Sequence, residues 1–74
     1  MLVAEVAVSG VEGQLKDEVY RAISLRAGRT TTRSELQQDI NAIFATGYFA
    51  KVRAEPEDTP LGVRVTFVVE PNPE

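Results

Sequence analysis

Residues 2–9, LVAEVAVS, alternate between two faces in the manner of a β-strand. Apolar positions on one of these faces are Leu2, Ala4, Val6 and Val8. Gly10 follows directly, and a glycine at that point is typical of a turn. The pattern therefore predicts a first strand with one buried face.

Residues 14–25 change to the three- and four-residue spacing of a helix. The apolar face of this helix consists of Leu15, Val19, Ala22 and Ile23. We expect Gly28 to end this helix, because glycine readily adopts the backbone conformation found at helix ends.

A second helix is predicted from Thr32 to about Thr46, and Thr32 and Glu35 have the spacing of a capping box. Its apolar stripe consists of Leu36, Ile40, Ile43 and Phe44, and its outer face of Arg33, Glu35, Gln38, Asp39 and Asn41. Gly47 follows the last turn, where a residue without a Cβ enters the left-handed conformation at little cost.

Two strands complete the chain. Residues 50–55 alternate between small apolar and charged side chains, and Pro56 is expected to close this strand. We expect Phe49 to belong to the preceding turn and to fold under the sheet. Residues 56–62 are predicted to form a hairpin loop, and residues 63–70 form the most apolar strand.

The predicted order is β-α-α-β-β, which is an α+β fold. The third strand is the most apolar, so we place it in the centre of a three-stranded mixed sheet with the order 1-3-2. Two antiparallel helices are expected to cover one face and to leave the other, charged face in water. Residues 1–74 are enough for a single small domain, and residues 70–74 are expected to form a proline-rich linker to a following unit.

The amino-acid composition excludes several kinds of catalytic and metal-binding site. The chain has no cysteine and no histidine, which removes the thiolate nucleophile, the commonest general base and the usual zinc ligands. The net charge of −3 argues against nucleic acid as a partner, because nucleic-acid-binding domains normally carry a basic surface. Carboxylates occur in short runs without a nucleophile or a phosphate-binding loop. We therefore expect no enzymatic activity, no catalytic or metal-binding residue, and no cofactor.

The order of elements and a set of residues resemble the POTRA domain, the polypeptide-transport-associated repeat of the BamA and Toc types of outer-membrane barrel-assembly protein. The residues that carry the resemblance are Asp39-Ile40, Gly47-Tyr48-Phe49, Val52 and the strand from Val65 to Pro71. It covers the chain from Val3 to Pro71. The proline-rich tail and the threonines at 30–32 point to a cyanobacterial or plastid-type member.

The resemblance implies a parent protein with several such domains in tandem ahead of a membrane β-barrel. It implies a periplasmic domain of an outer-membrane protein, whose partners are unfolded outer-membrane polypeptides, neighbouring POTRA domains and the barrel of the same chain. In the order 1-3-2 the second strand lies at an edge, where its unpaired backbone groups can receive an extended polypeptide by β-augmentation. The expected binding residues are Ala50, Lys51, Val52, Arg53, Ala54 and Glu55, and the motif Gly47, Tyr48 and Phe49 is expected to have a structural role.

Other interpretations stay open. Gly47-Tyr48-Phe49 also has the form of a helix C-cap followed by core aromatics, and charges on an edge strand also discourage aggregation. A docking domain in a division complex, as in bacterial proteins of the FtsQ type, has the same fold and is the alternative function. A nucleic-acid-binding module is disfavoured by the acidic composition and by the lack of exposed sheet aromatics.

Overall fold

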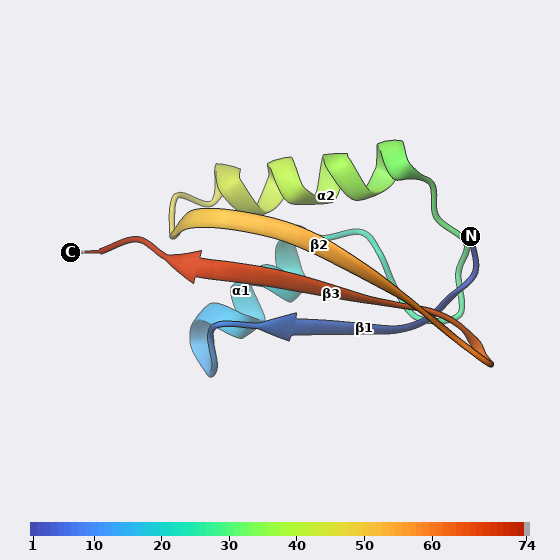
Figure 1. Ribbon diagram of the computed structural model, residues 1–74. Helices are drawn as coiled ribbons and strands as arrows, with labels where there is room; N and C mark the ends of the chain where they lie inside the picture. The colour runs from blue at the N-terminus through green and yellow to red at the C-terminus, as the bar shows by residue number, and fades with distance from the viewer. Residues whose placement is uncertain (74) are drawn as a thin grey trace.

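The computed structural model describes residues 1–73. Its elements are β1 (Val3–Ser9), α1 (Gln14–Ala22), α2 (Arg33–Ala45), β2 (Phe49–Thr59) and β3 (Gly62–Pro71). The three strands lie side by side, with α2 alongside β2 (Figure 1). The predicted α+β fold and the β-α-α-β-β order are confirmed.

β3 is the central strand of the sheet, which has the order β1-β3-β2. β1 runs parallel to β3, with Val6 opposite Val65, and β2 runs antiparallel to β3, with Val52 opposite Val69. Val65, Phe67 and Val69 on the inward face of β3 are almost completely buried, which is why the most apolar strand takes the position with neighbours on both sides. The predicted mixed sheet and its order are confirmed.

Each edge strand contains one extra residue near its start. The register against β3 shifts between Val3 and Glu5 in β1, and between Phe49 and Lys51 in β2. One extra residue reverses the alternation of side chains between the two faces. Val3 is therefore fully buried, whereas Leu2, which simple alternation places inside, is 50% exposed. Phe49 folds under the sheet as expected, but as the first residue of β2 and not as part of the turn.

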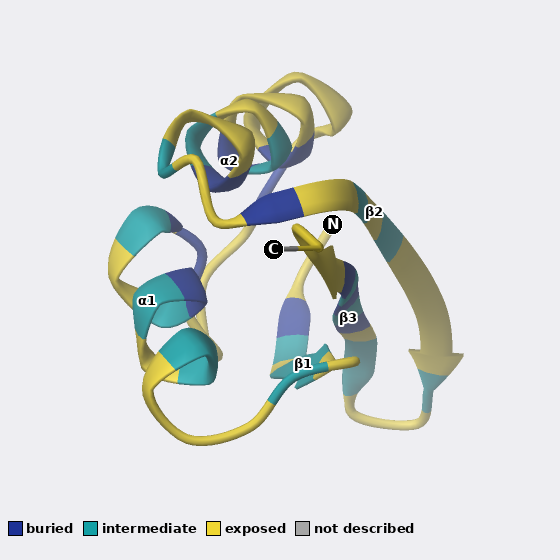
Figure 2. Cartoon of the chain, turned by 90° about the vertical axis from the view of Figure 1, so that its left-hand side faces the viewer, coloured by how far each residue is buried: buried dark blue, intermediate teal, exposed yellow. Residues whose placement is uncertain are grey.

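Both helices lie on one face of the sheet, and the buried parts of the strands face them (Figure 2). The buried core consists of Val3, Val19, Ile23, Leu25, Leu36, Ile43, Phe49, Val65, Phe67 and Val69. Burying a side chain of this size contributes about 1.5–3 kcal/mol, so this layer is the main force that holds the helices on the sheet. The predicted placement of two helices on one face is confirmed.

α1 ends earlier than the sequence predicts. Its last residue is Ala22, and Ile23 already has an extended backbone with φ −89° and ψ 148°. Leaving the helix here allows both Ile23 and Leu25 to enter the core, where they are 3% and 5% exposed. The expectation that Gly28 ends the helix is wrong: the Gly28 N–H instead donates to the Val3 carbonyl oxygen at 2.8 Å.

α2 begins as predicted, because the hydroxyl of Thr32 accepts a hydrogen bond from the Glu35 N–H at 3.2 Å. The placement of Asp39 on its outer face is wrong, since only 4% of this residue is exposed. The Asp39 carboxylate accepts hydrogen bonds from the backbone N–H groups of Ser24 and Leu25, in the segment that follows α1. A polar contact thus joins α2 to the connection between the helices.

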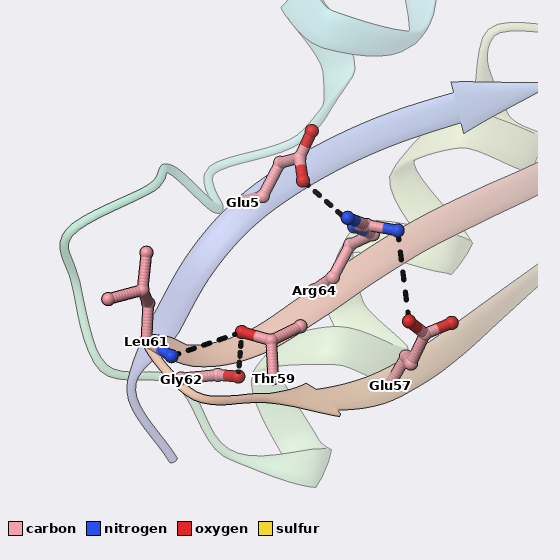
Figure 3. Close-up of polar contacts among 6 residues, drawn as sticks. All are labelled: Glu5, Glu57, Thr59, Leu61, Gly62 and Arg64. Atoms are coloured by element: carbon pink, nitrogen blue, oxygen red, sulfur yellow. Dashed lines mark hydrogen bonds and ion pairs between the residues drawn. The ribbon is translucent and has the colours of Figure 1, made fainter.

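β2 is longer than predicted, because Pro56 does not close it. The strand continues to Thr59 and ends in a two-residue turn. Proline is tolerated here because alternate N–H groups of an edge strand have no partner to supply. In the turn, the Leu61 N–H donates to the Thr59 hydroxyl at 3.3 Å, and this hydroxyl donates to the Gly62 carbonyl at 2.8 Å (Figure 3).

The sheet face away from the helices carries ion pairs across all three strands. Arg64 Nε in β3 lies 2.8 Å from Glu5 Oε2 in β1, and Arg64 Nη1 lies 3.7 Å from Glu57 Oε1 in β2 (Figure 3). The three side chains are between 45% and 67% exposed. Exposed pairs of this kind contribute about 0–1 kcal/mol each, and they keep this face polar.

Candidate functional site

β2 lies at an edge of the sheet: one side pairs with β3, and the other pairs with no strand among the described residues. The Val63 N–H donates to the Leu2 carbonyl, so Val63 and every second residue after it direct their backbone groups to β1. The intervening residues of β3 face β2, and they lie opposite Glu55, Arg53 and Lys51. It follows that Val52 and Ala54 direct their N–H and C=O groups away from β3, toward the open edge.

The six residues predicted to bind a polypeptide divide between two surfaces. Val52 and Ala54 are half-buried and pack against the core on the helix side. The exposed members of the set are Ala50, Lys51, Arg53 and Glu55. Lys51 Nζ lies 3.8 Å from Glu70 Oε2, and Arg53 Nε lies 2.8 Å from Glu55 Oε2. The edge therefore has an apolar side toward the helices and a charged, internally paired side toward water.

An open groove of about 510 Å³ lies at this edge. It is lined by Phe44 from α2, by Lys51, Val52 and Arg53 from β2, and by Val68 and Glu70 from β3. Phe44 is 43% exposed, although the apolar stripe of its helix predicts a core position. A segment that paired with β2 would lie next to this aromatic ring, so apolar contact adds to the backbone hydrogen bonds available there.

The turn before β2 fixes the start of the edge. Gly47 has a φ of +81°, and its N–H donates to the Phe44 carbonyl at 3.1 Å. The Asn72 side-chain amide donates to the Gly47 carbonyl at 2.7 Å, and the Asn72 backbone N–H donates to the Tyr48 carbonyl at 2.9 Å. Of the motif's two aromatics, Phe49 is 4% exposed and Tyr48 is 48% exposed. The turn that joins α2 to β2 is thus fastened to the residue that follows β3.

The opposite edge of the sheet is partly covered. The Val3 N–H donates to the Arg29 carbonyl at 2.8 Å, and Leu2 forms a bridge with Thr30. The Met1 carbonyl accepts from the Thr31 N–H at 2.8 Å. The segment between the helices therefore occupies the first part of the β1 edge, whereas β2 has no such cover among residues 1–73.

Among the described residues, no group of three or more histidine, cysteine, aspartate or glutamate side chains is arranged to hold a metal ion. Within residues 1–73, no helix has the length and apolar character needed to cross a membrane.

Three residues that line the groove were not predicted from the sequence: Phe44, Val68 and Glu70. Phe44 directly follows Ile43, which is fully buried. Adjacent residues on a helix point in directions about 100° apart, so when Ile43 lies at the centre of the buried face, Phe44 lies toward its side. This spacing is the signal that could have assigned Phe44 to the rim of the core.

The comparisons with known proteins agree with this arrangement. The family model described as POTRA, surface antigen variable number repeat, matches residues 1–72. The chain belongs to the POTRA family.

Solved POTRA structures are closely similar to it. The N-terminal domain of Omp85 from the thermophilic cyanobacterium Thermosynechococcus elongatus is 63% identical with a TM-score of 0.94, over 99% of this chain and 31% of that one. POTRA1-2 of the periplasmic domain of Omp85 from Anabaena is 60% identical with a TM-score of 0.91, over 97% of this chain and 47% of that one.

Plant relatives share the domain at lower identity. Outer envelope protein 80, chloroplastic, from Arabidopsis thaliana is 36% identical over 81 residues, and its counterpart from Oryza sativa subsp. japonica is 35% identical over 79 residues. The matches cover 100% and 97% of this chain but only 11% and 12% of the lengths of these proteins. Matches to cyanobacterial and chloroplast proteins confirm the predicted cyanobacterial or plastid type.

Proposed function

We propose that this POTRA domain is a non-catalytic polypeptide-binding module of an outer-membrane protein assembly machine. It receives an extended segment of an unfolded polypeptide or an accessory subunit along the open edge of β2. The observation that carries this proposal is the free edge at Val52 and Ala54, whose backbone N–H and C=O groups point away from the sheet beside the Phe44 groove.

The geometry supports recognition that depends little on sequence. Val52 and Ala54 together offer two donors and two acceptors to an added strand, and any residue except proline can pair with them. An alternating segment would place its apolar side chains toward Phe44 and its polar side chains next to Lys51 and Arg53. This alternation is typical of a strand that has one apolar face and one polar face in a folded sheet.

The energetics support transient binding. Each backbone hydrogen bond contributes about 0.5–1.5 kcal/mol net, so four bonds supply about 2–6 kcal/mol before the segment's lost conformational freedom is counted. These energies alone correspond to dissociation constants between about 40 μM and 30 mM, and the ordering cost weakens binding further, so millimolar or weaker dissociation constants are expected. Weak binding suits a domain that passes its substrate on.

The relatives support the wider setting. The matched Anabaena structure is described as POTRA1-2 of a periplasmic domain, so it contains more than one such unit. We infer that this domain is likewise periplasmic, that neighbouring POTRA domains adjoin it, and that a membrane barrel lies in the same parent chain. Residues 70–74 would lead to the next unit; Glu70 and Pro71 belong to β3, and Glu74 lies outside the described residues. The Omp85 and outer envelope relatives favour this function over the FtsQ-type alternative.

The proposal is tested by nuclear magnetic resonance titration with a capped peptide of alternating valine and threonine. Amide shifts are expected to concentrate in residues 50–55, with smaller changes near Phe44. The matched control is the same peptide with alternate backbone nitrogens methylated on one edge, which removes its donors but keeps its side chains. This control is expected to lose binding. Shifts that cluster on β1, or equal binding of the methylated peptide, would contradict strand addition at β2.

A further inference from the structure

β2 contains a proline within its paired length, shortly after the charge along the strand changes sign between Arg53 and Glu55. Pro56 lies opposite Val65 in the ladder with β3, and the strand continues to Thr59. Exposed charged residues before the proline include Lys51 and Arg53, and those next to it or after it are Glu55, Glu57 and Asp58. The two halves of this edge therefore differ both in backbone chemistry and in charge.

Pro56 belongs to the set of residues that face the open edge. Glu55 and Glu57 lie opposite Thr66 and Arg64, which direct their backbone groups to β2, so the residue between them faces away from β3. A strand added at this edge would require an N–H donor at that position, and proline has none. The open edge thus offers a complete donor and acceptor pair at Val52 and at Ala54, but only an acceptor at Pro56.

We propose that Pro56 ends the strand-accepting part of β2 and thereby fixes the length and register of the segment that binds there. The inference rests on the proposed function, which it makes more specific. The bound segment lies opposite residues 51–55 and exchanges backbone hydrogen bonds with Val52 and Ala54. A segment that extends further leaves a carbonyl group unpaired opposite Pro56 and meets the proline ring. Asp58 is the next residue that faces this edge, and a longer strand would have to pass the proline ring to reach it. The ligand is therefore a short extended segment.

The test is a length series of capped alternating valine–threonine peptides of five, seven and nine residues. For the wild-type domain, the dissociation constant is expected to stay within twofold beyond five residues. In Pro56→Thr the edge regains a donor, and the nine-residue peptide is expected to bind about fivefold more tightly than the five-residue one. The amide introduced at position 56 should shift with the longest peptide and not with the shortest.

Pro60→Thr is the matched control, because it makes the same change in the hairpin turn and leaves the open edge unaltered. It is expected to keep the wild-type length dependence. Pro56→Ala supplies the same N–H with a smaller side chain, and it should behave like Pro56→Thr if the donor is responsible.

The outcomes separate this inference from the function on which it rests. The inference fails, while strand addition at β2 stands, in either of two cases. In the first, the wild-type domain binds longer peptides progressively more tightly. In the second, both Pro56 variants show no gain in affinity beyond five residues, as expected for the wild-type domain. If neither the wild-type domain nor the variants bind any peptide of the series, the proposed function fails together with it.

Discussion

The carboxylate of Asp39 accepts two hydrogen bonds from Ser24 on the same oxygen, one from the backbone N–H and one from the hydroxyl, each at 3.0 Å. Its second oxygen accepts from the Leu25 N–H at 3.1 Å. Asp39 lies in the middle of α2 and Ser24 lies just beyond α1. One buried carboxylate therefore accepts hydrogen bonds from the backbone N–H groups of Ser24 and Leu25, in the extended segment that brings Leu25 into the core.

This relationship predicts that Asp39→Asn is strongly destabilising. The amide nitrogen of asparagine would face an N–H donor, so at least one buried donor loses its partner, and the free energy of unfolding should fall by about 2–4 kcal/mol. Ser24→Ala is the graded control: it removes only the hydroxyl bond and should lower this free energy by about 0.5–1.5 kcal/mol. Urea unfolding measures both. A loss below about 0.5 kcal/mol in Asp39→Asn would show that the carboxylate does not hold this connection.

A second prediction compares two glycines that both have positive φ. A Cβ at Gly10, where φ is +99°, would overlap the backbone carbonyl of Val69 in the central strand, whereas a Cβ at Gly47, where φ is +81°, meets nothing within 4 Å. Gly47→Ala is therefore expected to lower the stability by only about 1–2 kcal/mol of backbone strain. Gly10→Ala should lose at least twice as much, because β3 must move as well. Equal shifts in melting temperature for the two variants would contradict the close approach of Gly10 to β3.

Elements whose pattern lies within a few neighbouring residues could be predicted from the sequence. Every second residue from Val63 to Val69 is apolar, so β3 and its inward face follow directly from the sequence. The start of α2 follows from a threonine cap whose hydroxyl needs only the N–H three residues later. The sheet order then follows from the apolar character of β3, and this order places β2 and its candidate binding site at an edge.

The features that could not be predicted depend on distant partners. The extra residues in β1 and β2 exist only relative to β3, and alternation within one strand does not reveal them. That β2 continues past Pro56 depends on the pairing of residues 57–59 with β3, which the residues around the proline do not reveal. Asp39 has the spacing of the buried face, three residues after Leu36 and four before Ile43. A charged side chain is normally expected to be exposed, and its burial is explained only by its hydrogen bond with Ser24, which the sequence does not reveal.

A third prediction concerns the ion pairs that Arg64 makes with Glu5 and Glu57. Arg64→Met keeps the aliphatic contact of the side chain and removes both pairs, so the free energy of unfolding should fall by less than about 1 kcal/mol at low salt. The difference from wild type should shrink as salt is raised toward 1 M, where the screening length is about 3 Å. Arg53→Met, whose partner Glu55 lies on the same strand, is the control and should change less. A loss that persists at high salt would assign Arg64 a packing role instead.

The last prediction separates binding at the groove from stability. Phe44 is 43% exposed and lines the groove beside β2, whereas Leu61 is 82% exposed at the tip of the hairpin. Phe44→Ser removes the apolar surface that a bound segment would cover, so the alternating peptide should bind about three- to tenfold more weakly. Leu61→Ser removes a more exposed apolar side chain away from the groove and should leave the affinity unchanged. Unfolding curves show whether both variants remain folded at the titration temperature. Equal affinities for the two folded variants would mean that the bound segment does not extend over α2 and that backbone pairing with β2 accounts for all of its binding.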